Sequence, residues 1–241
     1  MRKISKCFAL AAIIFALTFT FTTQTAAQGL TSDFRSWINA NGYGGYDFAR
    51  DDLNGYGSYG GKSSPGDSVI NQPVIFIHGN SDSAIGRSSA FSGWNDSINY
   101  FASQGYKRSE MYATTWGDAS PSSSAYQYHS KPNIQKIRAF IQAVKAYTGA
   151  TKVDIVTHSM GVTLTRKAIL GGSGNDSLNG GSYNLGSPIT SSVDTFVGIA
   201  GANWGLVSCY QTNSSTPTCG ATNGLYPGYA SGSPPYGLSN I

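Results

Sequence analysis

Apolar runs and helically spaced apolar residues alternate along most of this 241-residue chain. The apolar runs predict strands buried within a sheet, and they occupy Pro73–Ile77, Met111–Trp116, Val153–Val156 and Val193–Ala200. Apolar side chains three and four positions apart predict helices at Gly93–Ser103, between Pro132 and Gly149, and at Val162–Leu170. Strands that alternate with helices predict one α/β domain with a parallel sheet and helices on both faces.

Three segments lack such a period. Leu30–Asn71 is rich in Gly and Tyr, so we expect irregular chain with one short helix near Ser32–Asn39, capped by Thr31 or Ser32. Gly171–Ser187 and the chain beyond Gly201 carry only loop signals. No internal repeat or second domain is apparent.

The first 27 residues have the pattern of a secretory signal peptide. Three basic residues precede an apolar stretch, Cys7–Leu17, that is too short to cross a bilayer, and small residues lead to Ala27. An uncleaved membrane anchor is the alternative. Cleavage would leave residues 28–241 as a secreted, extracellular protein.

Cleavage would also bring the charge close to balance. The chain has 16 basic and 12 acidic residues, and 13 of the basic ones lie beyond residue 27. No basic patch is visible, so we expect no nucleic-acid partner. We also expect no cofactor and no metal. The low charge, with 30 Gly and 15 Tyr, is typical of a loop-rich extracellular protein.

The cysteines fit the same compartment. Cys7 would leave with the signal peptide, so Cys209 and Cys219 remain as a pair in an oxidising environment. A disulfide between them is the favoured interpretation. Metal binding is the weaker alternative, because two thiols without a nearby histidine do not complete a tetrahedral site.

The strand Val153–Val156 leads into a motif that carries chemistry. Thr157-His158-Ser159-Met160-Gly161 connects this strand to the next helix, and such a sharp turn exposes a nucleophilic serine in the α/β-hydrolase fold. The usual turn has glycine two residues before and after the serine. Gly161 fills the second position, and Thr157 replaces the first. The alternative is that Ser159 only caps the helix.

A second motif follows an earlier strand, where Ile77 is succeeded by His78-Gly79-Asn80. In this fold a backbone N–H after an earlier strand and the N–H after the nucleophile form the oxyanion hole. We therefore expect the N–H groups of Asn80 and Met160 to stabilise a tetrahedral intermediate. His78 and His158 are each tied to a turn, so we interpret them as supporting groups rather than the base.

With these motifs the chain resembles the secreted lipases of the lipase class 2 family, which includes nematode lipases. The segments that carry the resemblance are Pro73–Ala84, Val153–Leu164 and Phe196–Asn203, and the likeness extends from about Phe34 onward. More distantly, the chain is similar to small bacterial lipases with an Ala-His-Ser-Met-Gly turn. The resemblance implies hydrolysis of triacylglycerols or other carboxylic esters, with Ser159 as nucleophile and the Asn80 and Met160 amides as oxyanion donors.

The acid and the histidine of such enzymes have no counterpart here. The fold orders them after the serine, yet the 82 residues after Ser159 contain no histidine and only two acids. We expect Asp176 in a loop and Asp194 at the end of the sheet opposite the serine. His129 is the one alternative base, and is otherwise a surface-loop histidine. We therefore expect an incomplete domain, without its C-terminal strands, whose acid and histidine lie beyond residue 241.

Two hypotheses of different classes follow. The first is a secreted serine ester hydrolase, either a triacylglycerol lipase or a carboxylesterase, that forms an acyl-serine intermediate and contacts lipid or small esters, including a lipid–water interface. The second is a non-catalytic protein of the same fold that binds lipid or a protein partner. Coding sequence for a further Asp and His beyond Ile241 would favour the first.

Overall fold

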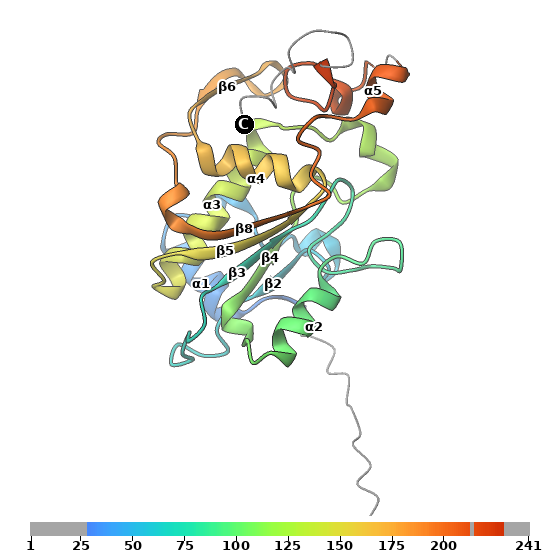
Figure 1. Cartoon of the computed structure of the whole chain (residues 1–241). Coiled ribbons are helices and arrows are strands. Elements are labelled where there is room, and N and C mark those ends of the chain that lie inside the picture. Colours follow the sequence, from blue (N-terminus) through green and yellow to red (C-terminus); the bar gives the residue numbers. More distant parts are fainter. Residues whose placement is uncertain (1–27, 213–214, 229–241) are drawn as a thin grey trace, which may run out of the picture.

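A six-stranded sheet forms the centre of the computed structural model, which describes residues 28–212 and 215–228 (Figure 1). The strand order is β1-β2-β4-β3-β5-β8, and every neighbouring pair is parallel except β2 with β4. The strands are β1 (Gly29–Leu30), β2 (Ser58–Gly60), β3 (Val74–Ile77), β4 (Met111–Thr114), β5 (Val153–His158) and β8 (Val193–Ile199). The predicted signal peptide, residues 1–27, lies outside the described residues.

Helices cover both faces of this sheet, as predicted. α1 (Ser32–Ala40), α3 (Lys131–Thr148) and α4 (Met160–Leu170) pack on one face, and α2 (Asn95–Ser103) packs on the other (Figure 1). The alternation of side chains along the fully buried β3 divides the core. Ile75 and Ile77 join the three-helix side, whereas Val74 and Phe76 contact the α2 side.

Local signals in the sequence account for the helix ends. The Thr31 hydroxyl accepts a hydrogen bond from the Phe34 N–H at 3.3 Å and caps α1. The Ser130 hydroxyl caps α3 in the same way, and Pro132 lies in its first turn, where no backbone donor is needed. Gly149 ends α3 with a φ of +73°, which glycine adopts without strain.

Two expectations about irregular segments were wrong. The region before Asn71 contributes β1 and β2 to the sheet, and β2 runs antiparallel to β4, so the sheet is mixed. The segment Gly171–Ser187 contains a hairpin of β6 (Ser173–Asp176) and β7 (Gly181–Asn184). These strands are short and mostly polar or glycine, so no apolar alternation marked them in the sequence.

The chain beyond β8 is also more ordered than its loop signals indicated. It forms the short helix α5 (Val207–Gln211), and the predicted disulfide between Cys209 and Cys219 is present with a Cα–Cα distance of 5.2 Å. The 3-10 turns of the described chain are Gly44–Tyr46, Asp51–Leu53, Arg108–Glu110, Pro121–Tyr126, Ser177–Asn179, Thr190–Ser192 and Pro217–Cys219.

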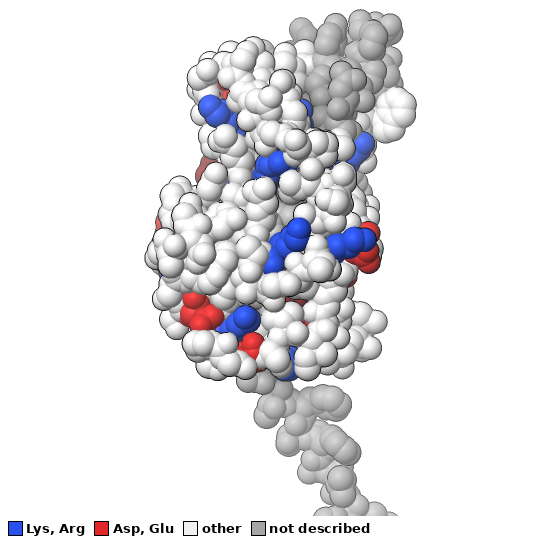
Figure 2. Space-filling view, turned by 90° about the vertical axis from the view of Figure 1, so that its left-hand side faces the viewer, with Lys and Arg blue, Asp and Glu red and all other residues white. Residues whose placement is uncertain are grey.

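The described residues were compared with the requirements for a membrane-spanning helix and for a metal site. Within them no helix combines the length and apolar character that crossing a bilayer requires. The same part of the chain contains no cluster of three or more metal-ligating side chains. On the face drawn in Figure 2, Lys and Arg are spread among uncharged side chains rather than gathered in one basic patch.

Candidate active site

Ser159 occupies the turn between β5 and α4 in a conformation that few residues other than glycine adopt. Its φ is +53° and its ψ is −127°, and its backbone N–H donates to the Ile199 carbonyl of β8 at 2.9 Å. The side chain is half-buried, and the described residues give its hydroxyl no hydrogen-bond partner. The turn therefore presents an available hydroxyl at the carboxyl end of the sheet.

Two glycines allow the end of β3 to touch this turn. A Cβ atom on Gly161 would lie 2.3 Å from the His78 carbonyl oxygen, which no side chain tolerates. A Cβ atom on Gly79 would lie 3.0 Å from Cβ of Ser159 and 2.9 Å from Nδ1 of His158. The segment after β3 and the serine turn are thus in direct contact.

The departure from the usual motif at Thr157 also has a structural reason. Thr157 is fully buried, and its hydroxyl donates to the Val197 carbonyl of β8 at 3.1 Å. The side chain therefore lies against the neighbouring strand rather than across the turn. A threonine fits here because its one polar atom has a partner.

The two predicted oxyanion donors are geometrically available. Among the described residues, neither the Asn80 nor the Met160 backbone N–H has a hydrogen-bond acceptor. Met160 is the first residue of the 11-residue helix α4, where N–H groups lack intrahelical acceptors and the helix dipole favours negative charge. The Asn80 side chain is held elsewhere, because its amide donates to the Ser124 carbonyl at 2.9 Å.

His78 holds the peptide that carries the Asn80 N–H. Its Nε2 accepts from the Trp116 backbone N–H at 3.2 Å, so the ring proton is on Nδ1, which donates to the Gly79 carbonyl at 2.6 Å. The Gly79 carbonyl and the Asn80 N–H belong to one planar peptide unit. Fixing the carbonyl therefore fixes the direction of the N–H.

The His78 ring is held in its neutral form. It is fully buried and stacks on the Trp116 ring, with centroids 5.2 Å apart. Burial lowers the pKa of His78 to about 3, although the hydrogen bond to Gly79 opposes this. At neutral pH the ring therefore keeps one donor and one acceptor.

His129 is not the surface-loop histidine that the sequence left as an alternative. It is 2% exposed, its Nδ1 lies 2.9 Å from the Asn223 carbonyl, and its Nε2 lies 2.6 Å from the Thr163 hydroxyl. Burial lowers its pKa to about 4. Both ring nitrogens are engaged away from Ser159, so this histidine is poorly placed to accept the serine proton.

The remaining candidates also stay apart from one another. His158 is exposed beside Ser159. Asp176 is buried at the end of β6 rather than in an open loop, and it accepts from the Tyr128 hydroxyl at 3.0 Å and the Lys131 N–H at 2.8 Å. Asp194 pairs with Lys152 at 2.8 Å at the amino end of β8, opposite the serine, as expected. In the described part of the chain no carboxylate bonds to a histidine.

A cavity of about 260 Å³ opens beside the serine turn. Its lining includes His158, Gly79, Trp94 and Ile199, which come from the carboxyl ends of three neighbouring strands and from the start of α2. Ligands of open α/β sheets bind at this end of the strands. The cavity reaches the serine turn through His158 and Gly79, and it lies at the same edge of the sheet as the Ser159 hydroxyl and the Asn80 and Met160 N–H groups.

Comparison with known proteins identifies the family of this chain. Residues 71–233 match the family described as lipase (class 2). Among solved structures, lipase B of Aspergillus fumigatus is similar at 15% identity and a TM-score of 0.40, over 66% of this chain and 31% of that one. The family match covers more than half of the chain and includes both motifs. The chain belongs to the class 2 lipase family.

Proposed function

We propose that this protein is a serine ester hydrolase and that Ser159 is its nucleophile. Family membership supports an activity of the lipase or esterase type. The observation that carries the proposal is the contact between the serine turn and the segment after β3, where Gly79 and Gly161 leave room for Ser159 to lie against the segment that leads to Asn80. A capping serine would need neither the strained turn nor this contact.

In the proposed reaction the Ser159 oxygen attacks the ester carbonyl carbon as a base removes the serine proton. The carbonyl oxygen becomes an anion that accepts hydrogen bonds from the Asn80 and Met160 N–H groups. The bond to the alcohol then breaks, the alcohol takes the proton, and an acyl-serine remains. Water attacks this intermediate in the same way and releases the acid.

We propose that the base is a group outside the described residues. His78 and His129 are buried with both ring nitrogens occupied, and His158 makes no hydrogen bond to Ser159. The same observation favours the second hypothesis, a non-catalytic protein that binds lipid or a partner at this site. Activity measurements separate the two.

Exposed apolar residues support a lipid or ester substrate. Ile199 and Val207 are 45% and 48% exposed, Leu206 lies between β8 and α5, and no charged residue follows Asp194 anywhere in the chain. Such a surface contacts acyl chains or a lipid–water interface without desolvating charge. Val207→Asp should lower activity on an emulsified triglyceride and leave activity on a dissolved short-chain ester unchanged.

The decisive experiment measures hydrolysis of a short-chain nitrophenyl ester by the chain with and without added imidazole. If the base is a group outside the described residues, imidazole should raise the rate above that of imidazole without protein, Ser159→Ala should abolish this excess, and His129→Ala should not. Removal of triad members in serine hydrolases leaves roughly a thousandfold or more of catalysis over water, so a trace rate is expected without imidazole. A rate indifferent to Ser159→Ala would refute the proposal and favour the binding protein.

Secretion is part of the proposal and has its own test. N-terminal sequencing of protein collected from the medium of expressing cells should begin at or near Gln28. A mature chain that retains Met1 would show that residues 1–27 are not removed.

A further inference from the structure

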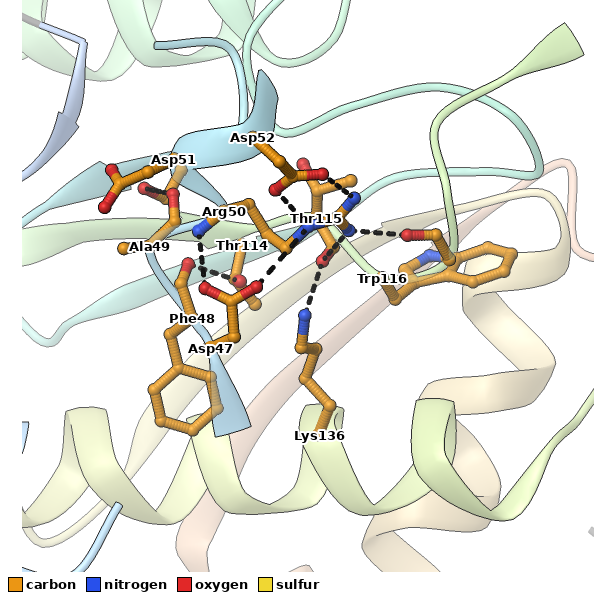
Figure 3. A network of polar contacts seen from close by, with 12 residues as sticks. Asp47, Phe48, Ala49, Arg50, Asp51, Asp52, Thr114, Thr115, Trp116 and Lys136 are labelled. Carbon is orange, nitrogen blue, oxygen red and sulfur yellow. Dashed lines mark hydrogen bonds and ion pairs between the residues drawn. The ribbon is translucent and has the colours of Figure 1, made fainter. Parts of the chain in front are cut away.

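We propose that Arg50 is a positioning residue for the oxyanion hole, acting through Trp116 and His78. This inference rests on the proposed function, because it concerns the Asn80 N–H that the proposed reaction uses. Arg50 lies in the segment before β2, and no sequence motif marks it. Its contacts are shown in Figure 3.

The Arg50 guanidinium binds the backbone on both sides of Trp116. Its Nη1 donates to the Thr115 carbonyl at 3.2 Å and to the Gly117 carbonyl at 2.5 Å (Figure 3). Its other edge makes two parallel hydrogen bonds of 2.8 Å to the Asp52 carboxylate. Only a planar guanidinium has enough donors in fixed directions to make all four bonds.

The segment that carries Arg50 is itself fastened to β2 and β4. The Ser58 hydroxyl donates to the Ala49 carbonyl and the Thr114 hydroxyl donates to the Phe48 carbonyl, each at 2.8 Å. Arg50 has a φ of +49° and its side chain is only 9% exposed. A buried arginine in this conformation, held on one edge by Asp52 and on the other by the two carbonyls that flank Trp116, has little freedom to move independently of that turn.

Trp116 transmits this constraint to the oxyanion peptide. Its indole Nε1 donates to the His78 carbonyl at 2.8 Å, and its backbone N–H donates to the His78 ring. His78 in turn holds the Gly79 carbonyl, whose peptide carries the Asn80 N–H. The path from Arg50 to Asn80 therefore consists of hydrogen bonds of 2.5 to 3.2 Å, joined by the backbone at Trp116 and by the Gly79–Asn80 peptide.

Lys136 adds a second donor at the start of this path. Its Nζ lies 3.3 Å from the Thr115 carbonyl (Figure 3). The Gly117 carbonyl, by contrast, has no other side-chain donor among the described residues. Loss of Arg50 should therefore release the Gly117 side of the turn first and let the Trp116 ring shift against His78.

The test compares Arg50→Met with Arg35→Met in the imidazole-supplemented ester assay. Arg35 is a matched control, because it also forms two hydrogen bonds to one carboxylate, Asp51, and one to a backbone carbonyl, but has no contact with Trp116. Removing one oxyanion donor outright costs roughly a hundred- to a thousandfold in kcat. Arg50→Met leaves the donor present but misaligned, so we expect kcat to fall about tenfold with KM unchanged.

Further variants separate positioning from general destabilisation. Arg50→Lys should recover only part of kcat, because an ammonium group cannot bridge both carbonyls and Asp52. Trp116→Phe removes the bond to the His78 carbonyl further along the same path and should lower kcat by a similar factor. If Arg50→Met does not fold, the Arg50→Lys and Trp116→Phe values decide the matter.

Equal kcat values for the Arg50 and Arg35 variants would overturn the inference, as would a rise in KM at constant kcat. Retained kcat in both Arg50→Lys and Trp116→Phe would also overturn it. Failure of the proposed function itself gives a different result, because Ser159→Ala would then leave the rate of the parent protein unchanged. The two failures are thus distinguishable in one set of assays.

Discussion

The backbone conformation of Ser159 should lower the stability of the folded protein, and a glycine at this position should relieve that strain. A residue with a side chain held at φ +53° and ψ −127° is strained by about 1–3 kcal/mol. Glycine adopts this conformation freely but loses about 0.5–1 kcal/mol more backbone entropy on folding than alanine. Ser159→Gly should therefore be more stable than Ser159→Ala by up to about 2 kcal/mol, although both lose the hydroxyl.

The assay is thermal and urea unfolding of the two variants side by side. For a domain of this size 1 kcal/mol corresponds to about 2–4 °C in Tm, so the glycine variant should melt several degrees higher than the alanine variant. Ester hydrolysis should be absent from both. Alanine is the proper reference because it removes the same oxygen atom and keeps the strained Cβ.

A control at an unstrained position should show the opposite order. Ser97 lies within α2, where helical φ makes glycine about 1 kcal/mol worse than alanine. Ser97→Gly should therefore melt below Ser97→Ala. If Ser159→Gly proves less stable than Ser159→Ala, the turn stores no strain and the reasoning from its φ fails.

Three further predictions concern stability. Burial opposes ionisation of Glu110, but four hydrogen bonds to its carboxylate outweigh this and lower its pKa. Glu110→Gln should therefore lower the free energy of unfolding in urea by about 2–4 kcal/mol at pH 7. This difference should shrink as the pH falls through the lowered pKa of Glu110. Burial, aided by the charge of Arg50, lowers the pKa of Lys136 to about 8. Lys136→Met should therefore raise the free energy of unfolding by about 1–3 kcal/mol at pH 7, and this gain should fade between pH 8 and 10.5. Equal stability of the variant and the parent at pH 7 would contradict this prediction. Cys209 and Cys219 close a short loop, so reduction should lower the free energy of unfolding by about 2–3 kcal/mol, and a non-reduced digest without the linked peptide would refute the pairing.

The sequence predicted the strands and helices that bury many apolar side chains. β3, β5 and β8 lie where apolar runs placed them, and α3 lies between Pro132 and Gly149 as its spacing indicated. Such elements are determined by burial, which leaves a period in the sequence. β2 and the β6–β7 hairpin were not predicted, because these strands depend on their pairing partners rather than on an apolar face of their own.

The site divides along a similar line. Ser159, Asn80 and Met160 could be proposed from the sequence because a turn, a strand end and a helix start leave local signatures in it. Arg50 and Trp116 could not, since their roles depend on contacts between residues far apart in the chain: 65 and 67 positions separate Arg50 from the carbonyls that it binds, and 38 separate Trp116 from His78. A buried arginine that binds backbone carbonyls leaves no pattern to read.

In the serine turn, glycine is needed only where the neighbouring backbone leaves no room for a side chain. Gly161 is required because the His78 carbonyl approaches within 2.3 Å of where a Cβ atom would lie. The preceding motif position has no such neighbour, and Thr157 there donates to the Val197 carbonyl instead. The two glycine positions of the usual motif are therefore not equivalent in this chain: Gly161 keeps the end of β3 in contact with the Ser159 turn, whereas the side chain at position 157 strengthens the link between β5 and β8.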